Sequence, residues 1–368
     1  MKNIVCLLIM ILSGLSCFAQ LIRGPEIIEN NRVIFKVNAP GASEVKVINL
    51  SDSAAIGDNE YLLSKDEKGV WTVTTNPCRP GLHYYELSID GARVSDPASP
   101  AYFGWGKWTS CIEIPDPALD FYLPSDVPHG DVRYYWYLSK TTGSYRKCLV
   151  YTPPGYDRDA SERYPVLYLQ HGAGESELGW IMQGKANFIL DNLIAEGKAR
   201  PMIIVMDNGY APRPGAENPY RPVGNDNLFA ELVINELIPM IDKSYRTLAS
   251  RDDRAIAGLS MGGGQALNTG LRHPELFASV ATFSGGSRNL NIDTSYSGVF
   301  NDAARFNNIF NLFFVGCGTL EGGYPTMEEF HEALNFKGIR HVWSEPVGSH
   351  EWQVWRFHLF EFAQKLFR

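Results

Sequence analysis

One serine stands in a sequence setting that is typical of a catalytic nucleophile. Ser260 lies in the stretch AGLSMGGGQ, which gives a Gly-x-Ser-x-Gly pattern with Gly258 and Gly262. Small flanking residues permit the strained backbone of a sharp strand-to-helix turn, which exposes the serine hydroxyl. The backbone N–H of Met261, at the start of that helix, would stabilise a developing oxyanion. We therefore expect acyl transfer through a covalent serine intermediate, and the alternative is a helix N-cap serine in a glycine-rich turn.

A serine nucleophile needs a base, and His350 is the histidine best placed to supply it. In the chain order of nucleophile, acid and histidine, the base follows the serine. His350 stands in VGSHEW, in the short loop expected between the last strand and the last helix. The other histidines after the serine are interpreted as surface or packing residues, because they lie inside helical patterns, at a helix end or at a strand start: His273, His331, His341 and His358.

The third member of such a triad is a carboxylate, and we assign it to Glu321. This residue is the one carboxylate in the loop CGTLEGGYPT, residues 317–326, which follows the apolar run NLFFVG. Its role would be to accept the imidazole N–H and to favour the protonated ring. The alternative is a solvent-exposed loop glutamate. In that case the acid would be one of four other carboxylates: Asp293, Asp302, Glu328 and Glu329.

The stretch LQHGAGESELGW, residues 169–180, follows another apolar strand and offers backbone N–H groups that can complete an oxyanion hole. Ala173 is the expected donor, with Gly172 next, while His171 is interpreted as a residue that packs the turn. Several aromatic residues could line a slot for substrate or simply pack. We assign three of them to substrate binding, with Tyr210 as a further candidate: Trp180, Tyr220 and Trp352.

The elements that would position these residues belong to an α/β architecture. From residue 131 to 368, nearly continuous apolar runs alternate with amphipathic helical runs. This alternation predicts a mostly parallel sheet that is covered on both faces. In such a sheet the site lies at the C-terminal ends of the strands, which is where the serine, acid and histidine loops fall.

The first part of the chain has a different pattern. Residues 21–115 form short alternating runs separated by Pro, Gly and Asp-Gly turn signals, with no helical stretch. This pattern predicts a small immunoglobulin-like β-sandwich. Residues 116–130 are proline-rich and aperiodic, and we interpret them as a linker.

The first 19 residues predict a secretory signal peptide. They contain one lysine, an apolar run and Ala19 before Gln20. The run is shorter than the roughly 20 residues that span a bilayer. We therefore expect a secreted or periplasmic protein, with lipid anchoring at Cys17 as the less favoured alternative.

The net charge and the cysteines limit which partners, disulfides and metals the sequence supports. The net charge of −8, with both signs mixed along the chain, argues against a nucleic acid or an anionic membrane as partner. The four cysteines after the leader lack metal-site spacing, so we expect buried thiols, with a Cys78–Cys111 disulfide as an alternative. No metal or cofactor is needed for the predicted chemistry.

With these residues assigned, the chain from about Val127 to Arg368 resembles carbohydrate esterase family 1. This group of α/β-hydrolases includes feruloyl and acetylxylan esterases. The resemblance is carried by YLQHGAGESELGW, AIAGLSMGGGQAL, FFVGCGTLE and GSHEWQVWRFHLFEFAQKLF. It implies an acyl-ester hydrolase with Ser260 as nucleophile, His350 as base and Met261 in the oxyanion hole. The sequence departs from the family at Glu321, where members usually have aspartate.

The resemblance also suggests the substrate. It implies feruloyl esters on plant cell-wall xylan or its oligosaccharides, with acetylated xylan as the runner-up. Two further alternatives are a siderophore esterase and a carbohydrate-binding protein with a degenerate triad. The first region, with VIFKVNAPGASEVKV and PGLHYYELSIDG, is similar to early-set domains related to carbohydrate-binding module family 48. Such domains often act as structural caps, so glycan binding is not assumed. Trp71 lies in an alternating strand and is expected in the core, whereas Trp105 and Trp108 face either solvent, as a sugar platform, or the second domain.

Overall fold

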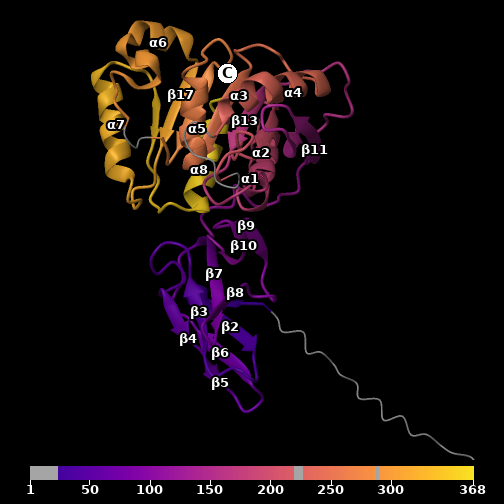
Figure 1. The fold of residues 1–368 in the computed structure, drawn as a ribbon, viewed down its shortest axis with the longest axis vertical. Helices are drawn as coiled ribbons and strands as arrows, with labels where there is room; N and C mark the ends of the chain where they lie inside the picture. The colour runs from indigo at the N-terminus through magenta and orange to yellow at the C-terminus, as the bar shows by residue number, and fades with distance from the viewer. Residues whose placement is uncertain (1–23, 219–226, 287–289) are drawn as a thin grey trace, which may run out of the picture.

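The computed structural model describes residues 24–218, 227–286 and 290–368. Residues 24–114 form two β-sheets and make up the lower body in Figure 1. Its first sheet has the order β1 (Glu26–Ile28), β2 (Arg32–Asn38), β6 (Val70–Thr74), β5 (Ser64–Lys65). Its second sheet has the order β4 (Glu60–Leu62), β3 (Val45–Asn49), β7 (Gly81–Ile89), β10 (Lys107–Ile114), β9 (Ala101–Gly104), and β8 (Ala92–Val94) also pairs with β7.

Alternating apolar residues hold these two antiparallel sheets together. Every second residue of β2 is buried, starting from Val33, and the alternate residues face outward. Because successive side chains of a strand point to opposite faces, this pattern gives each sheet one apolar face. The two faces meet in a common core that includes Val33, Phe35, Val45, Val47, Trp71, Leu87 and Ile112. The expected immunoglobulin-like sandwich is confirmed, with Trp71 in its core.

The second region is built on one eight-stranded sheet. Its order is β11 (Asp131–Ser139), β12 (Ser144–Thr152), β14 (Ile203–Asp207), β13 (Val166–Gln170), β15 (Arg254–Leu259), β16 (Ser279–Phe283), β17 (Leu312–Gly316), β18 (Val342–Ser344). β12 pairs antiparallel with both β11 and β14, and all pairs from β14 to β18 are parallel. The central strands β13 to β16 are buried along their whole length, as strands covered on both faces must be.

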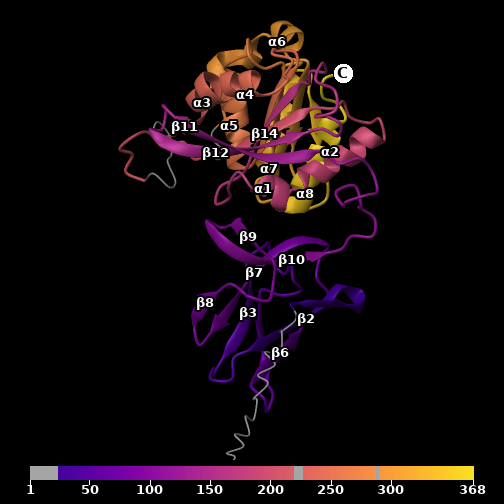
Figure 2. The same cartoon turned by 90° about the vertical axis from the view of Figure 1, so that its right-hand side faces the viewer.

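Helices cover both faces of this sheet (Figures 1 and 2). One face carries α2 (Ala186–Ala195) and α8 (Trp352–Ala363), with the short α1 (Gly179–Met182) beside them. The other face carries α3 (Phe229–Leu232), α4 (Ile238–Ser244), α5 (Met261–Gly270), α6 (Ala303–Ile309) and α7 (Tyr324–Phe336). A π-helical turn, Val233–Leu237, joins α3 to α4, and short 3-10 turns occupy Glu29–Asn31 and Ser295–Asn301. The α/β-hydrolase fold expected from the sequence is confirmed.

The cysteines of the sandwich do not form the disulfide considered above. All four cysteines in the described part of the chain are buried free thiols. Cys78 packs in the sandwich core, whereas Cys111 packs in the second region's core beside Leu82 and Tyr84. The two thiols therefore lie in separate apolar clusters, which is the physical reason for the missing bridge.

Candidate active site

Ser260 occupies a strained turn between β15 and α5. Its backbone angles are φ 50° and ψ −114°, a conformation that costs free energy for a residue with a Cβ. The neighbouring glycines make the turn sterically feasible. A Cβ on Gly258 would lie 2.4 Å from the carbonyl oxygen of Gly262, and a Cβ on Gly262 would lie 2.4 Å from that of His171. The Gly-x-Ser-x-Gly pattern is thus a packing requirement of this turn.

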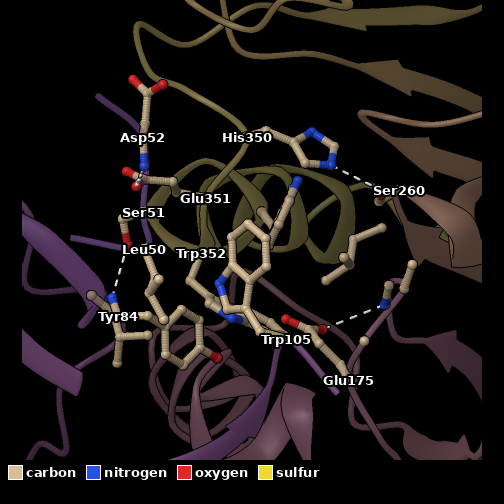
Figure 3. A pocket seen from close by; sticks show the side chains of 16 residues that line it. Leu50, Ser51, Asp52, Tyr84, Trp105, Glu175, Ser260, His350, Glu351 and Trp352 are labelled. Carbon is tan, nitrogen blue, oxygen red and sulfur yellow. Dashed lines mark hydrogen bonds between the residues drawn. The ribbon is translucent and has the colours of Figure 1, made fainter. Parts of the chain in front are cut away.

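A continuous set of hydrogen bonds joins the serine to a carboxylate through His350. The serine Oγ lies 2.9 Å from His350 Nε2 (Figure 3). On the other side of the ring, His350 Nδ1 lies 2.6 Å from Glu321 Oε2. Because the ionised carboxylate can only accept, Nδ1 carries the proton and Nε2 accepts from the serine hydroxyl. The structure thus brings together the serine, histidine and carboxylate assigned from the sequence.

Glu321 is a buried carboxylate, not an exposed loop residue. Its Oε1 accepts hydrogen bonds from Ser284 Oγ at 2.6 Å and from the Gly318 N–H at 2.8 Å. Burial favours the neutral acid, but the hydrogen bond and charge of His350, together with these two donors, hold the pKa of Glu321 below its usual value. The fallback acids are therefore not needed, because the acceptor on His350 Nδ1 is already supplied.

Two further residues support this carboxylate and were not anticipated from the sequence. Trp355 Nε1 donates a hydrogen bond to Ser284 Oγ at 3.2 Å, and the Ser284 hydroxyl in turn donates its hydrogen bond to Glu321 Oε1. The Trp355 ring also lies edge-on to the His350 ring, with centroids 5.0 Å apart. No sequence motif marks Ser284. It lies in the loop after β16, and its contact with Glu321 arises only when the sheet brings the two loops together.

The loop expected to complete the oxyanion hole lies beside the serine. Ala173 is exposed in the pocket next to Ser260, whereas the Gly172 N–H donates to Glu175 Oε2 at 3.4 Å. Met261 begins α5, where the first N–H groups have no acceptor within the helix. Ala173 and Met261 therefore offer the better pair of donors, and Gly172 is already engaged.

His171 packs this turn, as the sequence suggested. Its Nε2 accepts from the Gly209 N–H at 2.9 Å, and its Nδ1 donates to the Gly172 carbonyl at 2.8 Å. Burial lowers the pKa of His171 to about 4, so the ring is neutral at pH 7. Both ring nitrogens are used, and this histidine is not available as a base.

A pocket of about 520 Å³ opens at the serine (Figure 3). Its walls are largely apolar and aromatic, which suits an organic acyl group. Residues from both regions line it. The hydrolase region supplies residues 172–175, Leu259, Ser260, His350, Glu351, Trp352 and Trp355, and the sandwich supplies Leu50, Ser51, Asp52, Leu82, Tyr84 and Trp105.

Of the residues assigned to substrate binding from the sequence, only some line the pocket. Trp352 lines the pocket, but the assignment of Trp180 is wrong. Trp180 is not among the residues that line the pocket: its Nε1 donates to the Gln170 carbonyl at 2.9 Å, and its ring packs against the ring of Trp352. Tyr220 lies outside the described residues. Tyr210 lines a neighbouring groove, and its hydroxyl accepts from the Gly174 N–H at 2.8 Å.

Glu175 is a further pocket residue that the sequence did not single out. It is 7% exposed, and burial raises the pKa of its carboxyl to about 8. The group is therefore protonated over most of the neutral range. A neutral Glu175 leaves the negative charge of this pocket to the other two carboxylates that line it, Asp52 and Glu351.

The sandwich touches both loops that carry the site. At the tip of the β9–β10 hairpin, Trp105 and Gly106 have φ of 60° and 79°, as a two-residue hairpin turn requires. The Gly106 N–H donates to the Gly174 carbonyl at 2.7 Å, which anchors this tip on the oxyanion loop. Trp105 thereby enters the pocket, so of the two orientations left open from the sequence it faces the second region.

The sandwich also holds the loop on either side of His350. Ser349 Oγ donates to Asp52 Oδ2 at 2.6 Å, and the Asp52 N–H donates to Glu351 Oε1 at 2.9 Å. Arg79 pairs with the same Asp52 carboxylate at 2.9 Å. Both chain neighbours of the histidine are therefore hydrogen-bonded to Asp52, which lies about 300 positions earlier in the sequence.

Two negative observations apply to the described residues alone. Nowhere in residues 24–218, 227–286 and 290–368 do three or more His, Cys, Asp or Glu side chains gather as metal ligands. In the same ranges, each helix is too short or too polar to cross a bilayer.

An elbow serine hydrogen-bonded to a histidine and a buried carboxylate, on an α/β-hydrolase sheet, is the arrangement of a serine hydrolase. A family model for esterases, described as "Putative esterase", matches residues 139–303. The chain is 40% identical over 343 residues to an endo-1,4-beta-xylanase/feruloyl esterase of Xylanibacter ruminicola. That match covers 91% of this chain and 44% of the relative, so the chain spans about half the relative's length.

Solved structures of two esterases are also similar to this chain. The CE1 ferulic acid esterase of Anaeromyces mucronatus is 28% identical, with a TM-score of 0.56 over 68% of this chain and 96% of that one. The enterobactin esterase of Shigella flexneri, 19% identical, matches 96% of this chain with a TM-score of 0.67 and so shares the fold of both regions. The chain is therefore similar to the CE1 feruloyl esterases, and these matches support a carboxylic ester hydrolase.

Proposed function

We propose that this protein is a serine esterase that releases feruloyl groups from plant cell-wall xylan. The observation that carries the proposal is the hydrogen-bonded chain Ser260–His350–Glu321, which opens on an aromatic-walled pocket. The names of the similar proteins, a xylanase/feruloyl esterase and a CE1 ferulic acid esterase, support the substrate class.

The proposed reaction has two steps. His350 Nε2 removes the hydroxyl proton as Ser260 Oγ attacks the ester carbonyl, and the sugar alcohol leaves with a proton from the imidazolium. The N–H groups of Ala173 and Met261 stabilise the oxyanion in each tetrahedral intermediate. Water then attacks the acyl-enzyme, with His350 again as base, and ferulic acid is released. Glu321 stabilises the imidazolium in both steps.

The glutamate in place of the usual aspartate is compatible with this mechanism. Its carboxylate lies 2.6 Å from His350 Nδ1 and has two further donors, so the longer side chain is fixed in a bonded position. This geometry argues against a degenerate, non-catalytic site.

The test is a comparison of three esters under identical conditions: methyl ferulate, acetylated xylan and a catecholate siderophore triester. We expect methyl ferulate to be hydrolysed with the highest kcat/KM, and we expect the Ser260→Ala variant to lose this activity. A preference for acetylated xylan would replace the feruloyl assignment with an acetyl one.

A siderophore esterase is the second candidate. The enterobactin esterase matches both regions of this chain and not only the hydrolase region, which is the observation that favours it. Hydrolysis of the siderophore triester at a higher kcat/KM than methyl ferulate would make this candidate the function.

We also propose that the chain is exported and processed after Ala19. The leader composition supports this proposal. Expression of the full chain in a bacterial host should give a periplasmic or secreted protein whose N-terminal residue, by mass spectrometry, is Gln20. Processing at Cys17 with an attached lipid would indicate an outer-surface lipoprotein instead.

A further inference from the structure

An exposed strip of large side chains runs along the β11–β12 hairpin. Tyr134, Trp136 and Leu138 alternate along β11 and are 58%, 64% and 59% exposed. The residues between them, Tyr135 and Tyr137, pack instead against the apolar core. A strand at the edge of a sheet with large apolar groups in solvent invites aggregation, so such a strip usually serves binding.

The partner strand extends the same face. Tyr145 of β12 stands opposite Leu138 and is 76% exposed, and Lys147 stands opposite Trp136. The Lys147 ammonium lies 5.6 Å from the Trp136 ring centroid and 5.7 Å from that of Tyr134. Cross-strand neighbours on one face of a hairpin contact one another, so these side chains form one flat surface. We call Tyr134, Trp136, Leu138 and Tyr145 the aromatic strip.

A groove of about 550 Å³ lies beside this strip, between residues of the hairpin and residues at the β9 end of the sandwich. Trp136, Tyr145 and Lys147 line its hairpin side, and Phe103 and Gly106 line its sandwich side.

The remaining lining of the groove is polar and already ordered. Arg146 is 8% exposed and donates to the Tyr210 carbonyl at 3.0 Å. Glu177 pairs with Lys147 at 3.1 Å and accepts from the Asn208 amide at 3.2 Å. Aromatic faces beside fixed donors and acceptors match the chemistry of a sugar ring, which has apolar C–H faces and an equatorial rim of hydroxyls.

The groove adjoins the ester pocket. Gly174 and Glu175 of the oxyanion loop line both cavities. An ester has an acid part and an alcohol part, and both must find room when the carbonyl is at the serine. The apolar pocket suits the acid, which leaves the adjoining groove for the alcohol.

We propose that the aromatic strip and its groove bind the xylan main chain whose side groups carry the ester. This inference rests on the proposed function. Pyranose rings stack on Trp136 and Tyr145, and hydroxyls exchange hydrogen bonds with Glu177, Asn208 and Lys147. A neutral glycan is favoured over an anionic polymer because the groove's lysine is paired with a glutamate and the net charge is −8.

The test compares small and polymeric substrates in the variant Trp136→Ala/Tyr145→Ala. The matched control is Phe336→Ala, which removes a ring that is 94% exposed on α7, away from the groove. We expect kcat/KM for methyl ferulate to be unchanged in both variants. Release of ferulate from polymeric feruloylated arabinoxylan should fall roughly ten-fold in the double variant only. Binding of the Ser260→Ala protein to de-esterified arabinoxylan, by affinity electrophoresis, should be lost when the two strip substitutions are added.

The outcomes separate the two claims. If wild type hydrolyses methyl ferulate but the double variant keeps full activity on the polymer and full binding, the groove proposal is wrong and the esterase proposal stands. If wild type hydrolyses no feruloyl ester, the proposed function fails, and the binding arm still decides whether the strip holds xylan. A wild-type dimer that the double variant converts to monomer, without glycan binding, would make the strip a contact between copies and overturn the proposal.

Discussion

At the scale of single residues, the site depends on how Glu321 is held. The carboxylate accepts from His350, Ser284 and the Gly318 N–H. Glu321→Gln replaces an anion that stabilises the imidazolium by a neutral amide, so we expect kcat to fall about 10³-fold or more with little change in KM. Glu321→Asp should lose activity too, because the shorter side chain withdraws the carboxylate from Nδ1.

The measurement is steady-state kinetics on methyl ferulate, with the melting temperature as a check on folding. Near wild-type kcat in Glu321→Gln would show that another group supports the histidine.

Glu175 gives a pH-dependent signature. The pKa of its carboxyl in the folded protein, about 8, is above the ordinary value of 4.5. A raised pKa means that the group's contribution to stability is fully present below pH 4.5 and is lost as pH rises through about 8, since the buried carboxyl must then ionise. Between pH 5 and pH 9 we therefore expect the melting temperature of wild type to fall, relative to that of Glu175→Gln, by at least about 3 °C.

The measurement is the thermal unfolding of wild type and Glu175→Gln at several pH values across this range. Parallel melting curves at every pH would contradict a neutral buried Glu175.

At the scale of elements, much of the site could be read from the sequence and part of it could not. Strand-to-loop boundaries placed Ser260, Glu321 and His350 at one edge of the sheet, since parallel strands bring their C-terminal ends together. The slot residues were less predictable. Trp180 and Trp352 both sit in apolar helical patterns, and only three-dimensional packing shows that the second, not the first, lines the pocket.

The loop that carries His350 is itself positioned from outside the hydrolase region. Asp52 accepts from Ser349 and donates through its N–H to Glu351. Asp52→Ala removes the carboxylate from one side of this loop, so we expect kcat on methyl ferulate to fall by about ten-fold, because small displacements of a base are costly. Asp52→Asn keeps an acceptor oxygen and should retain most of the activity.

Asp58→Ala is the control, because Asp58 is an exposed sandwich carboxylate whose one side-chain bond goes to its neighbour Asn59. Equal kcat in wild type and Asp52→Ala would show that the loop holds its conformation unaided.

At the scale of the whole molecule, the sandwich completes the site. It supplies one wall of the pocket, the hairpin tip on the oxyanion loop and the contacts around His350. Local sequence patterns predicted the sandwich but not this docking, because the contacts join positions up to 300 residues apart. Trp105 in the turn YFGWGKW was noticed from the sequence, yet its place in the pocket depends on how the two regions meet.

A buried ion pair fixes this arrangement. Arg356 of α8 is 0% exposed and donates to both oxygens of Glu113 at 2.6 and 2.9 Å. Arg356→Met leaves the glutamate without its partner, so we expect a loss of about 3 kcal/mol in the free energy of unfolding and a weaker contact between the regions. Glu113→Gln should cost at least as much, because it leaves the fully buried Arg356 guanidinium without a counter-charge.

Chemical denaturation of wild type and the variants measures both the free energy of unfolding and whether the two regions unfold together. A single unshifted transition in Arg356→Met would contradict a stabilising role for this ion pair.

The central claim, that Ser260 is the acylated nucleophile of this esterase, is tested most directly by covalent labelling. After reaction with an organophosphonate ester, peptide mass spectrometry should locate one adduct on Ser260, in parallel with loss of methyl ferulate hydrolysis. The Ser260→Ala variant should show neither the adduct nor the activity. Labelling at another residue, or methyl ferulate hydrolysis that persists in Ser260→Ala, would contradict the account.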